Sequence, residues 1–418
     1  MLKKVSLDQK VRAKDFLKFA PMAQQQRILE YVQALKGKKI VHVNATGQGG
    51  GVAEILQSFI PYLNVFGLRA EWYAIDADQP GKRFFEITDK IRNGLQGQAV
   101  EIKKEEWDVY ENANREITKE LESIACDILV VHDWQPAYAG FYLARSTPKV
   151  FVSHADTSSA YKPVADQIME AMRGYDAMIF SNKDFVYPEF AEKTNIHVIA
   201  PAIDPLSLKQ STVPQKDARA YLVPFGVPGT GRFIVQVSRF DNWKNPQGVV
   251  EAFRIVQESH ADVYLALVGI EEAQDNPDSK KVYEEVKGMV GDNPHISLFF
   301  SAKGIPHIAE FTMMAQNAAD IVVQNSIKEG FGLTVTEAMW KEKPVVGGPA
   351  SGVRLQITHG KNGFIAENTK DLAMYMDFLL SHPKERARVG KAAKESVRKR
   401  FLMPRFVLDH LKVYKELI

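Results

Sequence analysis

Short apolar segments alternate with longer segments of helical periodicity along the whole chain. In the first half the apolar segments fall at 39–44, 70–75, 128–132, 149–153, 177–180 and 197–199, and in the second half at 233–238, 263–268, 296–300, 321–324 and 344–347. The residues after the first segment place apolar side chains on one helix face, at Val52, Ile55, Leu56, Phe59, Ile60 and Leu63. Buried strands separated by helices form parallel sheets, so the pattern predicts an α/β fold.

The length of the chain predicts two domains. Its 418 residues exceed the roughly 250–300 residues that one hydrophobic core usually serves. The alternation restarts after Pro201 and Pro205 and a polar stretch at 209–216, so we place an interdomain hinge there, between domains at 1–205 and 206–399. Two doubly wound domains would present the carboxyl ends of their strands to a central cleft, the usual ligand position in such folds.

The composition is that of an ordinary globular protein, with 45% hydrophobic and 25% charged residues. A net charge of only +2 predicts no nucleic-acid partner. Apolar segments are too short for a membrane helix, and the basic helical segment from about Ser381 onward, ending through Phe406, Leu408, Leu411 and Tyr414, is interpreted as a solvated helix face. The single cysteine, Cys126, and an N-terminus without an apolar leader favour a cytoplasmic protein.

The segment from Lys328 to Met339 is the most informative stretch of the sequence. Two carboxylates, Glu329 and Glu337, are separated by seven residues, with glycines at the turn and a short apolar helix after it. The start of a helix presents backbone N–H groups and a favourable dipole to an anion. Such a turn could hold a phosphate with its backbone and hydroxyl groups with its carboxylates, as a nucleotide sugar requires.

A second polar turn follows the strand at 233–238. Arg239 and Lys244 are cations five residues apart, and Asn245-Pro246 begins a helix. A guanidinium fork and a mobile ammonium together suit a diphosphate. Two surface cations beside a turn are the alternative interpretation.

Three polar segments follow strands of the first half. Gly47-Gln48-Gly49-Gly50-Gly51 lies between a strand and a helix, but Val52 stands where a dinucleotide fingerprint would have its third glycine. Consecutive glycines still allow close approach of a ligand to the backbone. His132-Asp133 and His154-Ala155-Asp156 follow two further strands, where this fold presents functional groups, although an isolated histidine is usually structural.

Ser238-Arg239 with Lys244, followed by Glu329 and Glu337, resembles the retaining glycosyltransferases of family 4, which have the two-domain GT-B fold. A closer resemblance is to the branch of that family that joins glucose from a nucleoside diphosphate-glucose to free glucose, forming trehalose. It is carried by residues 42–44 and 49–56, Asn93–Gly97, Val131–Asp133, Ile203–Ser207 and Glu329–Trp340.

The resemblance implies roles for residues of the second half. Arg239 and Lys244 would hold the donor diphosphate and stabilise the departing nucleotide, without a metal or other cofactor. Glu329 would contact the hydroxyls of the donor sugar, and Glu337 those of the ribose. Backbone groups of the turn would complete the donor site, at Gly330, Phe331, Gly332 and Leu333.

The resemblance also implies roles in the first half, onto which the C-terminal helix, about 400–418, is expected to pack back. His154 would lie near the transferred sugar, with Gly50 and Gly51 near the diphosphate. Acceptor-binding residues would be Asn93, Gln96, Asp133 and Asp156. Expected partners are a small sugar donor and a small sugar acceptor, and a homodimer is an open possibility.

Three segments depart from the pattern of the trehalose-forming branch, at 155–163, 181–184 and 347–352. Because they could touch the acceptor or the base, a related transferase remains open, with GDP-mannose or another donor and a glucosylglycerate or sugar-phosphate acceptor. A trehalose phosphorylase-type enzyme of the same fold would use inorganic phosphate. A hinged, non-catalytic sugar-binding protein is the third class, and the N-terminus without an export signal argues against it. The Arg239–Lys244 pair with Glu337 argues for a nucleotide ligand.

Overall fold

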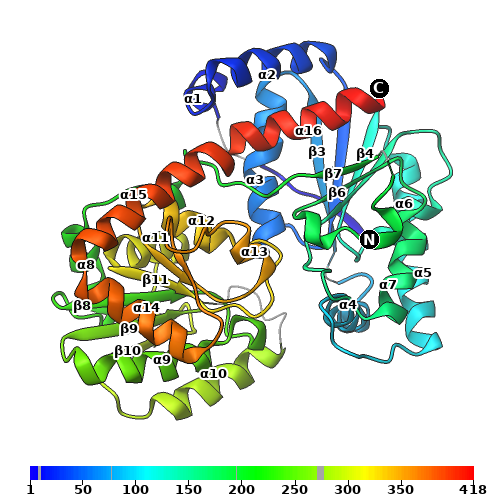
Figure 1. Cartoon of the computed structure of the whole chain (residues 1–418). Helices are drawn as coiled ribbons and strands as arrows, with labels where there is room; N and C mark the ends of the chain where they lie inside the picture. The colour runs from blue at the N-terminus through cyan, green and yellow to red at the C-terminus, as the bar shows by residue number, and fades with distance from the viewer. Residues whose placement is uncertain (8–10, 77, 194, 271–276) are drawn as a thin grey trace. The chain divides into compact units, whose positions relative to one another are not determined.

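The structure, a computed structural model, describes residues 1–7, 11–76, 78–193, 195–270 and 277–418. Its contacts divide the chain into two compact units, Met1–Ala202 with Met403–Ile418, and Ile203–Leu402. We call these the first and the second domain. Each consists of a sheet with helices packed against it (Figure 1).

In the part of the chain that the structure describes, the first domain has a seven-stranded sheet in the order β1-β3-β2-β4-β5-β6-β7. Its strands are β1 Leu2–Lys4, β2 Lys39–Asn44, β3 Arg69–Ile75, β4 Ile128–His132, β5 Lys149–Ser153, β6 Ala177–Phe180 and β7 Ile196–Val198. Its helices are α1 Ala13–Leu17, α2 Met22–Ala34, α3 Gly50–Val65, α4 Lys82–Leu95, α5 Lys104–Ser123, α6 Ala137–Tyr142, α7 Lys162–Met172, α16 Met403–Leu417 and the 3₁₀ turns η1 Lys183–Phe185 and η2 Pro188–Phe190.

The second domain has a six-stranded parallel sheet, β10-β9-β8-β11-β12-β13, among its described residues. Its strands are β8 Arg232–Val237, β9 Val263–Val268, β10 Ile296–Phe299, β11 Ile321–Gln324, β12 Val345–Gly347 and β13 Phe364–Ile365. Its helices are α8 Gln215–Leu222, α9 Pro246–Ser259, α10 Pro277–Val290, α11 Ile308–Ala318, α12 Leu333–Trp340, α13 Ser351–Arg354, α14 Thr369–Ser381, α15 Pro383–Arg400 and the 3₁₀ turns η3 Leu208–Gln210, η4 Val223–Phe225 and η5 Asn242–Lys244.

The central strands of both sheets are buried along nearly their whole length. All residues of β4, β6 and β11 are buried, and β2, β5 and β8 are buried after their first residue. A strand that is covered on both faces has a continuous run of apolar residues, whereas a strand with one face in water alternates apolar and polar residues. The predicted α/β architecture is therefore confirmed, with each of the eleven predicted strands present within two residues of its expected ends.

Two strands were not predicted. β1 has only three residues, two of them lysines, and pairs antiparallel with β3. β13 has two residues, beside β12. Segments this short carry no hydrophobic periodicity, so their pairing depends on partners far away in the sequence.

The polar stretch 209–216, predicted as part of a hinge, belongs to the second domain. Lys209 and Gln210 lie in η3, and α8 begins at Gln215. Asn317 on α11 holds this stretch by accepting from Val213 N (3.1 Å) and donating to Ser211 O (3.0 Å). These partly buried contacts hold the backbone of the polar stretch against α11, which the sequence did not reveal.

The basic C-terminal segment forms two helices, α15 and α16, and the second of them is the helix expected at about 400–418. α15 ends at Arg400, and Phe401 O accepts from Ile203 N (2.9 Å) before α16 begins. α16 packs on α2 and α3 of the first domain, as expected, and Figure 1 shows it in red alongside the blue α2. Its buried face includes Phe406, whose ring lies 5.1 Å from that of Phe59 on α3.

We expect Phe406→Ala to destabilise the first domain by about 3–5 kcal/mol, because it removes a buried ring and leaves a cavity. The measurement is urea unfolding followed by circular dichroism. Lys412→Ala, at an exposed position of the same helix, is the control and should change the free energy of unfolding by less than about 0.5 kcal/mol. Equal midpoints for the two variants would show that α16 does not stabilise this domain.

Candidate functional site

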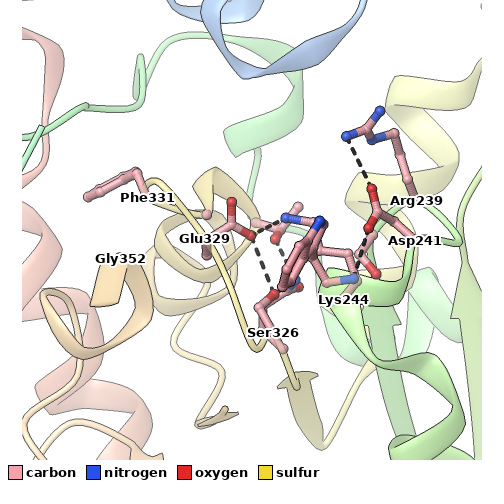
Figure 2. A network of polar contacts seen from close by, with 12 residues as sticks. Arg239, Asp241, Lys244, Ser326, Glu329, Phe331 and Gly352 are labelled. Carbon is pink, nitrogen blue, oxygen red and sulfur yellow. Dashed lines mark hydrogen bonds and ion pairs between the residues drawn. The ribbon is translucent and has the colours of Figure 1, made fainter. Parts of the chain in front are cut away.

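Two turns at the carboxyl ends of neighbouring strands form the charged centre of the second domain. The Glu329 turn, residues 328–332, follows β11 and leads into α12, while the Arg239 turn, residues 238–245, follows β8 and leads into α9. Lys244 Nζ donates a short hydrogen bond to Glu329 Oε2, to which Ser326 Oγ also donates (3.4 Å). Figure 2 shows the Lys244 and Glu329 side chains pointing toward one another.

Arg239 differs from Lys244 in its access to solvent. Its side chain is 46% exposed, against 16% for Lys244, and its guanidinium lies 3.7 Å from Asp241 (Figure 2). Asp241 also accepts from Trp243 N (2.8 Å), which caps η5. The second domain therefore presents one accessible cation, Arg239, and a second cation, Lys244, that is held by the Glu329 carboxylate.

Neutral polar side chains beneath these turns fix them to each other. Gln236 on β8 donates to Lys244 O (3.2 Å) and accepts from Asn325 N (3.1 Å). The backbone adds a contact from Ile327 N to Trp243 O (2.8 Å). Because buried donors and acceptors are costly when unpaired, this network restricts the turns to one arrangement.

The start of α13 packs directly against the Glu329 turn. Gly352 N donates to Glu329 O (3.1 Å). A Cβ atom at Gly352 would lie 2.5 Å from Glu329 O and 2.7 Å from Phe331 Cα, so no side chain fits there. The Phe331 ring is itself buried against Phe401, so Phe331 can meet a ligand only through its backbone. Backbone contacts of Gly330, Phe331, Gly332 and Leu333 with a donor stay a prediction.

Glu337, on α12, has no exposed surface. Lys209 Nζ lies 3.0 Å from its Oε1, and Gln316 Nε2 lies 3.5 Å from its Oε2. Lys341, also buried, donates to Glu337 O (3.3 Å) and Gln316 Oε1 (3.0 Å). The ribose role of Glu337 stays a prediction, and the structure adds that Lys209, 24% exposed, already pairs with this carboxylate.

The glycine loop of the first domain is exposed and stands at the start of α3. Gly49 and Gly50 have φ values of 73° and 76°, which favour glycine. No heavy atom lies within 4 Å of an added Cβ at either residue. Glycine is thus favoured at 49 and 50 by the backbone conformation and not by lack of space for a side chain. Gly50 and Gly51 remain candidates for ligand contact.

The structure brings His154 and Asp133 together at the ends of β5 and β4. Asp133 Oδ1 accepts from His154 N (2.7 Å), and Asp133 has a left-handed φ of 60°. Burial raises the pKa of the Asp133 carboxyl to about 7, against the lowering effect of that hydrogen bond. His154 Nε2 contacts His132 Nδ1 (3.0 Å), and His132 Nε2 contacts His42 Nδ1 (3.0 Å).

The remaining acceptor candidates lie on segments that touch one another. Asp156 is buried and accepts from Ser158 N (3.1 Å) and Ser158 Oγ (2.5 Å). The end of α4, which carries Asn93 and Gln96, contacts the same loop, since Tyr161 N donates to Gly94 O (2.8 Å). The two segments that carry these candidates are therefore in contact through their backbones.

No set of three or more His, Cys, Asp and Glu side chains among the described residues is arranged to hold a metal ion. Transfer without a metal or another cofactor stays a prediction. Within the same described ranges, no helix is both long and apolar enough to cross a membrane.

Comparison with known families shows to which family the chain belongs. The family model "Trehalose synthase, N-terminal domain" matches residues 42–187, and "Glycosyl transferases group 1" matches residues 219–396. The trehalose synthase of Pyrococcus horikoshii is 36% identical over 392 residues, which cover 94% of this chain and 93% of that protein. The trehalose synthase of Rubrobacter xylanophilus is 36% identical, with 93% of each covered.

The chain belongs to the trehalose synthase family of group 1 glycosyltransferases. Its fold is also that of the sucrose-phosphate synthase of Thermosynechococcus elongatus, with a TM-score of 0.72, 16% identity and coverage of 91% of this chain and 99% of that one. The GT-B fold and the assignment as a hexosyltransferase are thereby confirmed.

Sequence reasoning missed several residues that shape the site. Ser326 lies beside the Glu329 turn, and Lys209 reaches Glu337 from a stretch interpreted as a hinge. The segment 347–352 was expected to touch a ligand, but the contact of Gly352 with the Glu329 turn was not predicted. His42 offered a signal, because a histidine in the middle of an apolar strand must find a buried partner. Lys209 offered none, since its partner lies more than a hundred residues away.

We expect Gly352→Ala to lower kcat of hexosyl transfer about 10²-fold, because the added methyl group displaces the Glu329 turn by an ångström or so. Steady-state kinetics measure the effect. Gly288→Ala, in an exposed position of α10 with open space around its Cβ, is the matched control and should keep wild-type kcat. A Gly352→Ala enzyme with unchanged kcat would refute the tight fit.

The buried imidazoles predict a pH-dependent stability. Burial lowers the pKa of His42 to about 3, of His154 to about 4 and of His410 to about 3, and that of His132 well below its usual range. The unfolded chain binds these protons below about pH 6.5 and the folded chain does not, so each group's stabilisation is complete above that pH and decreases by about 1.4 kcal/mol per pH unit as pH falls toward its folded pKa.

Urea unfolding at several pH values between 5 and 7 measures this slope. His410→Leu should reduce the average slope over this range by about 1 kcal/mol per pH unit, because one such group is removed and its unfolded form is only partly protonated near pH 6.5–7. Phe59→Leu, at a buried ring beside His410, destabilises without removing a titrating group and should keep the wild-type slope. Asp133, with its raised pKa, acts in the opposite direction between about pH 4 and 7 and is unchanged in all three proteins. An unaltered slope in His410→Leu would contradict the buried, neutral imidazole.

Proposed function

We propose that this protein transfers a glucosyl unit from a nucleoside diphosphate-glucose to free glucose with retention, forming trehalose. The Lys244–Glu329 pair beside the accessible Arg239 carries the proposal, because a donor of this kind needs cations for its diphosphate next to an acceptor for sugar hydroxyls. Membership of the trehalose synthase family supports the identity of the sugar product.

Arg239 and Lys244 act on the leaving group. Their positive charges stabilise the negative charge that develops on the nucleoside diphosphate as the bond from its oxygen to the sugar C1 breaks. The N–H groups at the start of α12 add a dipole of the same sign. The release of nucleotide is thus assisted by charges that are already in place before the reaction.

Retention follows from substitution on one face of the sugar. The acceptor hydroxyl attacks C1 from the side that the phosphate oxygen leaves, its oxygen forms the new bond, and its proton passes to the leaving phosphate oxygen. Glu329 is assigned to bind donor sugar hydroxyls, with Lys244 holding its carboxylate in place. It is not assigned as a covalent nucleophile, in contrast to the paired carboxylates of retaining hydrolases.

In this proposal the first domain contacts the transferred sugar and the acceptor. His154 binds the transferred sugar, Gly50 and Gly51 approach the donor through their backbone, and Asp133 and Asp156 orient the acceptor with Asn93 and Gln96. In the second domain, Glu337 binds the ribose hydroxyls. No metal is assigned a step.

The test is a proton NMR assay of the purified protein with free glucose and, in turn, UDP-, ADP-, GDP- and TDP-glucose and GDP-mannose. A non-reducing disaccharide with the anomeric signals of an α,α linkage is expected with at least one glucose donor. We expect Arg239→Ala to lower kcat about 10²–10³-fold, because a preorganised charge on the leaving group is lost. Arg398→Ala, at an exposed pair on α15, is the control and should keep kcat.

Three other results would contradict the proposal or a part of it. Nucleotide release without a disaccharide would assign a different acceptor, such as a sugar phosphate or a glycerate. No turnover with any donor, together with sugar phosphate formed from trehalose and inorganic phosphate, would assign a phosphorylase. An Arg239→Ala enzyme with wild-type kcat would remove the assignment of the leaving-group site.

A further inference from the structure

Three histidines of the first domain form a continuous chain of ring contacts. His42 on β2, His132 on β4 and His154 after β5 stand on three neighbouring strands of the sheet. Their ring nitrogens meet in sequence, with Nδ1 of one facing Nε2 of the next at 3.0 Å in both contacts. The rings are nearly parallel, at 23° and 18°. His42 and His132 are buried, and His154 is the half-exposed end.

The chain is uncharged at neutral pH, because burial lowers the pKa of all three imidazoles. A neutral imidazole has one nitrogen that donates and one that accepts. Each contact therefore needs a donor on one ring and an acceptor on the other. Once the tautomer of one ring is set, both contacts set the tautomers of the other two.

Only two arrangements satisfy both contacts. In the first, every ring carries its proton on Nδ1, so His42 donates to His132, His132 donates to His154, and His154 keeps Nδ1–H for a ligand. In the second, every proton is on Nε2, so the direction reverses and His154 offers a bare Nδ1. Among the described residues, His154 Nδ1 has no hydrogen-bond partner, so this nitrogen is the one in the histidine chain that is left to bind a ligand.

The inner end of the chain distinguishes the two arrangements. His42 Nε2 is buried and, within the described ranges, accepts no hydrogen bond and donates none. Its ring neighbours are Phe59 and Tyr414, whose aromatic faces are weak acceptors. The second arrangement would leave an N–H group buried there without a partner, and orphaned buried N–H groups are rare.

We propose that His132 and His42 are positioning residues that hold His154 in the tautomer with Nδ1–H, as a hydrogen-bond donor to a hydroxyl oxygen of the transferred sugar. This inference rests on the proposed function for the sugar contact, but the tautomer itself does not depend on it. His154 in this form cannot accept a proton from the acceptor hydroxyl through Nδ1. The leaving phosphate oxygen then remains the group that takes that proton.

The tautomer can be read directly by ¹⁵N NMR of the full protein labelled at histidine. Protonated and bare ring nitrogens have widely separated shifts, and His154→Gln identifies the His154 signals by their loss. We expect His154 with a protonated Nδ1 and a bare Nε2, and the same for His132. Protonation of His154 at Nε2 would overturn the proposal, whatever the enzyme transfers.

Variants separate a positioning role from a packing role. His132→Leu removes the donor to His154, and we expect kcat/KM to fall about 10–100-fold with a mixed His154 tautomer. His132→Asn places an amide N–H near the position of Nδ1–H and should recover most of that loss. Val130→Ala, at a buried position of the same strand, should lower Tm without changing kcat/KM or the His154 signals.

A double-variant cycle completes the test. In a His154→Ala background, His132→Leu should lower kcat/KM by less than a further twofold, because the residue through which it acts is absent. Full additivity would overturn the proposal, since a purely structural effect of His132 persists without His154. If the wild type transfers no sugar, the proposed function fails while the NMR result still decides the tautomer.

Discussion

The ion pair between Lys244 and Glu329 is the contact on which the charged half of the site depends. Both side chains are largely withdrawn from water, at 16% and 14% exposure, so each charge would be costly without the other. Lys244 ends a 3₁₀ turn after β8, and Glu329 lies in a turn after β11, a neighbouring strand. The pair therefore fixes two segments that are far apart in sequence, and the Gln236 contacts to Lys244 O and Asn325 N support the same geometry without adding charge.

The two domains contribute different chemistry. The second domain concentrates charge at strand ends, with an exposed guanidinium, a paired ammonium and a buried carboxylate on α12. The first domain presents neutral imidazoles, an aspartate whose pKa is raised to about 7, and an exposed glycine loop. This division suits a reaction between an anionic donor and an uncharged acceptor, because a second set of strong charges around the acceptor would compete for the diphosphate.

The sequence predicted the architecture well because the central strands are buried on both faces and stand out as apolar segments. It also located Glu329, Arg239 and Lys244, since glycine, proline and charged residues cluster where strands end. It did not locate β1, whose residues are mostly lysine, or the structural role of 209–216, whose backbone is held by the Asn317 side chain on α11. Pairings between distant residues, such as Lys209 with Glu337, leave no local pattern from which they could be predicted.

The position of Lys209 links the domain boundary to Glu337, the residue predicted to bind the ribose. It lies in η3, a few residues after the boundary at Ala202, and its ammonium reaches a carboxylate without exposed surface on α12. Leaving a buried carboxylate without its partner strongly destabilises the fold. Either η3 therefore keeps Lys209 in contact with Glu337, or another donor takes the place of Lys209. Ribose hydroxyls are donors of that kind. In our interpretation, the ribose hydroxyls of the nucleotide and the ammonium of Lys209 therefore compete for the same Glu337 carboxylate.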